Sequence, residues 1–232
     1  MTDSALTRLT ASPAEVLQRL PGIGRVMILN STGGVTHERI GEIATVEVTG
    51  DEAVVRGPDH DSRIALSPIA AMIVDRSSVI RDKAFPRIDF RDAAGRVLFS
   101  AVSFAGMEPF DAALAGFAEL AEPAAGPGPE FARGADVDDA DPGRIALDRA
   151  QTGGQPVVIR IAQPGFTQRW EGVVEAVKPS MGFLNVLVPN FHFHLKGGSV
   201  GSWSGARTDE GEVLTALDPA GQEIGLQVVF PA

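Results

Sequence analysis

The chain has 232 residues, of which 44% are hydrophobic and 22% charged, a composition typical of a folded globular protein. It contains no cysteine, which excludes disulfides, thiolate catalysis and thiolate metal ligands. Its net charge of −10, without any basic cluster interleaved with aromatics, argues against nucleic acid and anionic membrane as partners.

Targeting and membrane-spanning segments are not expected. No run approaches the roughly 20 apolar residues that span a bilayer. The start, MTDSALTRLTASPAEV, lacks the basic-then-apolar pattern of a signal peptide. We therefore expect a cytoplasmic protein.

Secondary-structure signals follow one another clearly in the first half. SPAEVLQRL (12–20) predicts a helix with a Ser N-cap and a Pro in its first turn, stopped by Pro21-Gly22. Short apolar runs separated by Gly, Asp and Asn turns predict antiparallel strands and hairpins. A second helix is expected over Glu108–Leu120. The expected strands lie within 25–55 and at 69–74, 87–91 and 96–104.

Residues 121–156 differ in composition from the rest of the chain. They are rich in Pro, Gly and Asp, and residues 119–150 carry 8 Asp/Glu against 3 Lys/Arg. We interpret this segment as an acidic linker, with a short helix around 143–150. The run beginning at Asp136 fails the EF-hand spacing, since position 6 is Asp141 rather than Gly. The expected domains are 1–120, the linker 121–156 and 157–232.

The two halves repeat each other. At an offset of 131, Val26 aligns with Val157, Thr36 with Thr167 and Gly41 with Gly172. After a five-residue gap the offset is 126, and Asp92-x-Ala94-Gly95 aligns with Asp218-x-Ala220-Gly221. Each Asp-x-x-Gly is expected to form a tight turn between two strands. The repeat predicts an α+β fold in which two mainly antiparallel β-sheets stack, flanked by a few helices.

Three segments resemble a known family. LPGIGRVMILNSTGGVTHERIGE (20–42) is similar to the opening of the first half of the bacterial hemin-utilisation proteins of the HemS/ChuX kind. FLNVLVPNFHFHLKGGSVGSW (183–203) and VLTALDPAG (213–221) are similar to segments of the second half of the two-repeat members. The resemblance implies a cytoplasmic protein that binds heme between stacked antiparallel sheets and acts in heme trafficking or breakdown.

The chain departs from the family where iron is bound. Two-repeat members carry the ligand histidine on a helical segment between the halves, but here residues 61–191 contain no histidine. Tyrosine and cysteine are also missing from the sequence. Iron ligation is therefore left to His37, His60, His192, His194 or a methionine.

Each histidine has a functional and a structural interpretation. His192 and His194 are two apart on an expected strand and share a face, with Phe191 and Phe193 opposite. They are either ligands or part of a polar sheet face. His194 matches the family's His-Leu position, and His37 its His-Glu position, so both are candidate iron ligands. His37 is otherwise a partly buried side chain bonded to a neighbouring strand.

The other histidine, His60, lies in a turn among acidic residues and is expected to be solvated. Heme propionates also require cations, for which Arg207 and Lys196 are the first candidates, before Arg63, Arg76 and Arg81. Trp203, equivalent to Met72 in the repeat, lies either in the core or against the porphyrin.

Two classes of function follow. The first is a heme-binding protein for intracellular heme storage, trafficking or delivery in heme and iron utilisation. The second is a heme-degrading enzyme that releases iron. A divergent member that has lost heme and binds another small molecule or partner is a further alternative, and self-association into a homodimer is left open.

Overall fold

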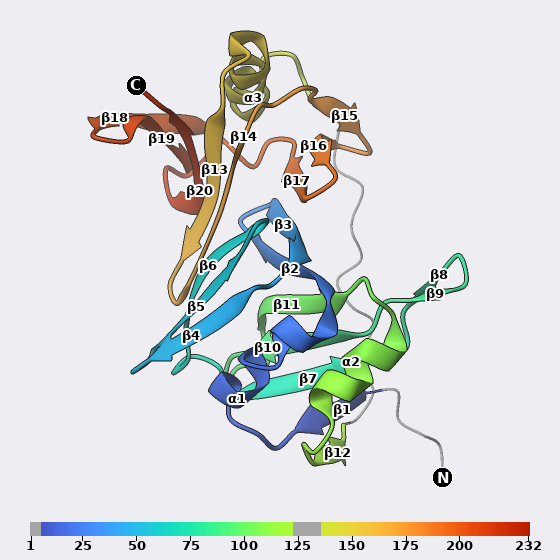
Figure 1. Cartoon of the computed structure of the whole chain (residues 1–232). Coiled ribbons are helices and arrows are strands. Elements are labelled where there is room, and N and C mark those ends of the chain that lie inside the picture. Colours follow the sequence, from blue (N-terminus) through green and yellow to red (C-terminus); the bar gives the residue numbers. More distant parts are fainter. Residues whose placement is uncertain (1–5, 123–135) are drawn as a thin grey trace. The chain divides into compact units, whose positions relative to one another are not determined.

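In the computed structural model, residues 6–122 and 136–232 are described, and the chain divides into two compact units (Figure 1). The first unit is Met1–Asn30 with Arg39–Glu130, and the second is Ser31–Glu38 with Phe131–Ala232. Among the described residues, three α-helices accompany many antiparallel strands arranged in two large sheets and one small hairpin. The expected α+β class with mainly antiparallel sheets is confirmed. The predicted domain boundaries at 120 and 157 remain a prediction.

The first unit contains a sheet with the strand order β12-β1-β7-β10-β11-β2, a meander β4-β5-β6 and a small hairpin β8-β9 that projects from the unit (Figure 1). The sheet strands are β1 (Leu6–Leu9), β2 (Arg25–Thr32), β7 (Ala71–Asp75), β10 (Arg87–Arg91), β11 (Val97–Ser103) and β12 (Glu119–Ala121). The other strands are β4 (Thr45–Thr49), β5 (Glu52–Gly57), β6 (His60–Ala65), β8 (Val79–Ile80) and β9 (Lys83–Ala84).

The second unit contains a sheet with the order β18-β19-β20-β13-β14 and a meander β17-β16-β15, which continues from the first residues of β3 (Val35–Glu42). The sheet strands are β13 (Val157–Gln163), β14 (Phe166–Gly172), β18 (Ser202–Thr208), β19 (Gly211–Leu217) and β20 (Glu223–Phe230). The meander strands are β15 (Lys178–Ser180), β16 (Phe183–Val188) and β17 (Phe191–Lys196).

The N-terminal helix forms where the sequence predicts it but ends earlier. Helix α1 (Pro13–Leu17) begins at Ser12, whose hydroxyl accepts the backbone N–H of Glu15 while the Glu15 carboxylate accepts the N–H of Ser12. The chain then tightens into the 3₁₀ turn η1 (Leu20–Ile23), which contains the predicted stop, Pro21-Gly22.

The second helix is shorter than expected. Helix α2 (Met107–Leu114) ends at Ala115, and Gly116 takes a left-handed backbone angle (φ 92°). Glu119 and Leu120, expected to be helical, instead belong to β12, which pairs with β1. The prediction was wrong there because a long-range strand pairing outweighed helical propensity.

The structure reproduces the repeat strand by strand. At the offset of 131, β16 and β17 coincide residue for residue with β5 and β6, and β13, β14, β15 and β18 overlap β2, β3, β4 and β7. The two Asp-x-x-Gly turns are also the same. The Asp92 and Asp218 carboxylates each accept two backbone N–H groups, and Gly95 and Gly221 have φ angles of 79° and 80°. The tandem repeat is therefore confirmed.

The equivalence extends into the segment expected to be a linker. Helix α3 (Pro142–Gly153) begins at Asp141, as α1 begins at Ser12, and in both a proline follows the cap. At an offset of 130, its buried Ala146 and Leu147 match the buried Val16 and Leu17 of α1, and its buried Ala150 matches Leu20 of η1. The predicted short helix around 143–150 is thus the counterpart of the N-terminal helix. Residues 123–135 of the expected linker lie outside the described residues.

Each unit is stabilised by an aromatic core. In the first unit the rings of Phe90 and Phe99 stack with centroids 4.3 Å apart, and Phe110 of α2 is fully buried. In the second unit Trp170 stacks on Phe191 at 4.4 Å. Burying each such ring contributes several kcal/mol, about 3–5 by the cost of truncation to alanine. Within the described residues, no helix is long and apolar enough to cross a membrane.

Candidate functional site

Strand β17 separates its aromatic and imidazole side chains onto opposite faces. Phe191, Phe193 and Leu195 are buried, whereas His192 and His194 lie half-buried on the other face with their ring centroids 6.5 Å apart. The alternation predicted from the sequence is therefore confirmed. It follows from the two-residue period of a strand, with the core face filled by the larger apolar side chains.

His194 is held by a hydrogen bond that fixes its tautomer. It lies directly opposite Asn185 on β16, and its Nδ1 is 2.6 Å from the Asn185 Oδ1. The Asn185 amide nitrogen donates to the carbonyls of Lys178 and Phe183 at 2.8 and 3.2 Å, so the oxygen must face the imidazole. His194 Nδ1 therefore carries the proton, and Nε2 presents its lone pair.

Burial also keeps this imidazole neutral. Desolvation lowers the pKa of His194 below its ordinary value, an effect opposed by the nearby Glu38 carboxylate and reinforced by His192. In the part of the chain that the structure describes, no residue hydrogen-bonds to its Nε2. A neutral imidazole with one nitrogen oriented by an amide and the other available is the arrangement of a metal-ligating histidine.

His192 is engaged differently. Its Nδ1 lies 3.2 Å from the Glu38 Oε2, and Glu38 is the better buried of the two, with 13% of its side chain exposed against 36% for His192. The pair places a carboxylate beside the two imidazoles. It holds the first residues of β3 against β17 on the face that carries His194.

An open cavity of about 450 Å³ lies on this face of the meander. Lys178, Asn185 and His194 line it as a row of directly opposite residues on β15, β16 and β17. The remaining lining residues are Thr36, Glu38, Ser180, Met181, Phe183 and Leu187. The volume falls within the range of about 300–1,000 Å³ typical of small-molecule sites.

The apolar part of the lining is unusually exposed. Met181 and Leu187 leave 68% and 51% of their surfaces accessible. Met181 also has a positive φ of 54°, which costs a residue other than glycine roughly 1–2 kcal/mol. Its counterpart in the first repeat is Gly50, with a φ of 59°. A methionine kept in a glycine conformation beside a cavity indicates a role for its side chain.

His37, the other candidate ligand, lies in the core of the second unit. It is fully buried, with its Nε2 3.1 Å from the Ile159 carbonyl and its Nδ1 3.0 Å from the Gln168 amide nitrogen. Its ring lies 4.8 Å from that of Phe191. Both ring nitrogens are therefore used within the protein, and His37 does not line the cavity.

The remaining candidates are not brought together with His194. Lys196 ends β17 and is exposed, while Arg207 and Trp203 lie on β18, a strand of the other sheet. The Trp203 indole donates to the Pro142 carbonyl at 2.9 Å. None of these three residues lines the cavity. The cationic side chain among its lining residues is Lys178.

His60 corrects the expectation that it is solvated. It begins β6, is 2% exposed, and its Nε2 lies 3.2 Å from the Gly41 carbonyl. Burial lowers its pKa. The neighbouring acids suggested a turn, but His60 is the first residue of a strand, which turns its ring inward between the half-buried Asp59 and Asp61.

The sequence interpretation missed Asn185, Lys178, Met181 and Glu38. One signal was available: Pro189-Asn190 is a two-residue turn, and counting outward from it places Asn185 opposite His194. No group of three or more His, Asp or Glu in the described ranges is arranged to hold a metal ion.

The comparisons agree with this architecture. Residues 1–106 match the family model of the haemin-degrading HemS.ChuX domain. The predicted resemblance to this family is therefore confirmed by sequence over that part of the chain. No curated protein matches the chain in sequence.

Two solved structures show how far the fold likeness extends. Escherichia coli ChuS, described as a heme oxygenase, has a TM-score of 0.77 at 19% identity, covering 98% of this chain and 84% of its own. Holo-PhuS of Pseudomonas aeruginosa, described as a heme-binding protein, has a TM-score of 0.75 at 21% identity, covering 98% and 81%. The likeness at these identities is one of fold.

Proposed function

We propose that the protein binds heme on the exposed face of the β15–β17 meander, with His194 Nε2 as an axial ligand of the iron. The observation that carries this proposal is the fixed tautomer of His194, which leaves an unprotonated Nε2 on a side chain that lines the cavity. Imidazole nitrogen is a common axial ligand of heme iron.

The rest of the lining fits the other parts of a heme. Met181, Phe183 and Leu187 supply apolar surface for the porphyrin, and Lys178 supplies a cation for a propionate. The donor set is also suitable, because a chain without cysteine or tyrosine must use histidine or methionine. In this proposal His37 keeps the core in place rather than binding iron, and Lys196 stays a candidate for the second propionate.

The proposed role is intracellular heme storage, trafficking or delivery in heme and iron utilisation. The likeness to PhuS, described as a heme-binding protein, supports this role. Bound heme would supply an iron centre, while the residues of this chain would orient the ligand nitrogen, cover one side of the ring and neutralise a propionate.

A hemin titration of the purified protein tests the proposal. We expect a saturable, shifted Soret band at one heme per chain, and a loss of affinity of at least about tenfold in His194→Ala. Arg63→Ala is the matched control, because Arg63 occupies the same position in the first repeat and should leave binding unchanged. Non-saturating absorbance in the wild type, or an unaltered spectrum in His194→Ala, would refute it.

Heme degradation is the second candidate. His194 lines the cavity, while His192 contacts Glu38 and is not among the lining residues, so a bound heme would meet one of the two imidazoles. The matched family model is described as haemin-degrading, and ChuS as a heme oxygenase. Adding a reductant such as ascorbate to the heme complex in air should then bleach the Soret band. A persistent band would leave the binding role alone.

A further inference from the structure

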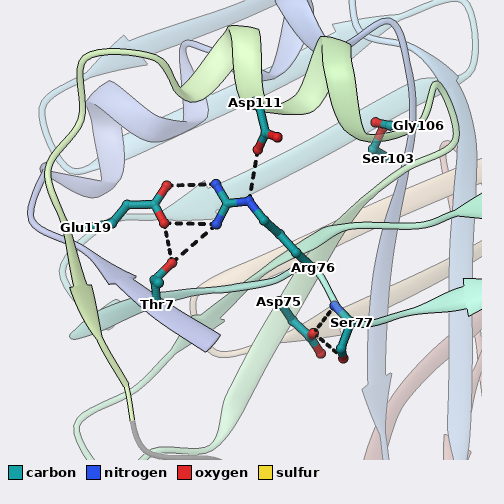
Figure 2. Close-up of polar contacts among 8 residues, drawn as sticks. All are labelled: Thr7, Asp75, Arg76, Ser77, Ser103, Gly106, Asp111 and Glu119. Carbon is teal, nitrogen blue, oxygen red and sulfur yellow. Dashed lines mark hydrogen bonds and ion pairs between the residues drawn. The ribbon is translucent and has the colours of Figure 1, made fainter. Parts of the chain in front are cut away.

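The edge of the first repeat's sheet is covered by additional strands. Strand β1 pairs with the outer side of β7, and β12 pairs with β1. Arg76, the residue directly after β7, binds side chains of β12 and α2 and so stabilises these added strands (Figure 2). Its guanidinium contacts both Glu119 carboxylate oxygens at 2.8 and 2.9 Å and Asp111 of α2 at 2.9 Å. Thr7 of β1 donates to the same Glu119.

At the equivalent edge of the second repeat, the structure describes no covering strand. Strand β18 is the counterpart of β7, and it ends its sheet with β19 as its only neighbour among the described strands. Arg207 is the counterpart of Arg76, yet it forms no ion pair within residues 6–122 and 136–232. Residues 204–208 are all exposed.

The sequence explains why residues 136–139 form no covering strand. At the offset that aligns α1 with α3, residues 136–139 stand where β1 stands in the first repeat. They read Asp-Val-Asp-Asp instead of the Leu-Thr-Arg-Leu of β1, and they form no strand. Acidic residues are poor strand formers and solvate well, so this segment does not pair with the edge.

The register of β18 identifies the backbone groups at this edge. Thr208 and Gly211 flank a two-residue turn and are paired. Hydrogen-bonded and open pairs alternate along an antiparallel hairpin, so residues 204, 206 and 208 face β19. The N–H and C=O groups of Trp203, Gly205 and Arg207 therefore point away from the sheet.

We propose that β18 pairs with β18 of a second copy of this chain, antiparallel about Gly205. This register places the outward backbone groups of residues 203, 205 and 207 opposite those of 207, 205 and 203 in the partner. Trp203 then lies opposite Arg207 on one face, an aromatic–cation pair. On the other face Ser204 meets Ala206, and Ser202 meets Thr208, so small side chains permit close approach.

The charge of the strand favours a second copy of the chain over other occupants. Arg207 is the only charged residue of β18. The twofold register sets it against an indole rather than against another guanidinium, so no like charges oppose each other. Strand edges of this kind pair readily unless charges, proline or bulges block them, and closed twofold dimers are the commonest assembly. Because one strand pair buries little surface, the dimer should be weak.

Gly205 allows a test that leaves the fold of the monomer intact. A Cβ built there meets only Leu214 Cδ2 at 3.5 Å, an ordinary contact, and its φ is not positive. In Gly205→Lys two lysines face each other across the twofold axis. Sedimentation of the full chain should show wild type exceeding the 24.3 kDa monomer as concentration rises, with dimerisation weakened at least about tenfold in this variant. Gly205→Ala is the control that should still dimerise.

Charge complementation separates a lost interface from a damaged protein. Gly205→Glu should also be monomeric, and an equimolar mixture of Gly205→Lys and Gly205→Glu should restore dimers. A wild type that stays monomeric up to its solubility limit would overturn the proposal. So would dimers that persist unchanged in Gly205→Lys, or a mixture that fails to reassociate.

Discussion

The β4–β6 and β15–β17 meanders have the same backbone and different chemistry. The row Lys178, Asn185 and His194 corresponds to Glu47, Val54 and Arg63, which are also opposite one another across their strands. In the first repeat this face carries exposed ion pairs, such as Arg63 with Glu52 at 2.9 Å. In the second it carries apolar side chains and imidazoles around a cavity. The repeat thus supplies one scaffold, and a few outward positions determine whether its exposed face carries ion pairs or a cavity.

The sheet edges differ in the same way. Arg76 binds the covering strand β12 through Glu119 in the first repeat, while its counterpart Arg207 lies on a strand that no other described strand covers. One arginine at one backbone position is therefore structural in one copy and available for contacts in the other. Duplication followed by local substitution explains both differences without any change of fold.

The largest expected effect comes from making the second meander resemble the first. Asn185→Val introduces the residue found at position 54 and removes the amide that orients His194. Loss of such an orienting group typically weakens metal binding about 10–100-fold. We expect that loss in a hemin titration, with near-native unfolding in denaturant. Val54→Asn, the reciprocal change, should leave hemin affinity unchanged. Equal affinity of Asn185→Val and wild type would show that the tautomer is not what distinguishes the repeats.

The two arginines should differ next in their contribution to stability. Arg76→Ala removes charge-assisted hydrogen bonds to two carboxylates and should lower the free energy of unfolding by about 2 kcal/mol. Arg207→Ala should change it by less than about 0.5 kcal/mol. Chemical denaturation of the two variants under the same dilute conditions measures both values. Equal losses of unfolding free energy in the two variants would contradict the role of Arg76 in stabilising β1 and β12 at the sheet edge.

The smallest expected effect concerns the turns at the tips of the meanders. Gly50→Met forces a side chain into a left-handed conformation and should destabilise the protein by about 1 kcal/mol. Met181→Gly should relieve a similar strain while reducing hemin affinity, because an apolar contact in the cavity is lost. Thermal unfolding and hemin titration of both variants provide the measurements. A Met181→Gly variant that loses stability and keeps full affinity would argue against a ligand-binding role for this methionine.

Local patterns were sufficient to predict the repeat, most strands and the shared face of His192 and His194. These features depend on a two-residue period and on turn residues, which can be seen in a short window of sequence. The Asp-x-x-Gly turns were predictable because Asp accepts nearby N–H groups and Gly takes a positive φ wherever the chain must turn tightly.

What the sequence by itself determined is the duplicated β-rich architecture and the faces of its strands. Only the tertiary structure decided which histidine meets a cavity, since His37 and His194 look alike in sequence but lie in the core and on the cavity wall. It also decided that Glu119 joins a strand and that β18 has no covering strand among the described residues. The burial of His37 beside Gln168 and the pairing of Glu119 with Leu9 depend on partners more than 100 residues away in the chain. Such partners are selected by packing and hydrogen-bond satisfaction rather than by local propensity.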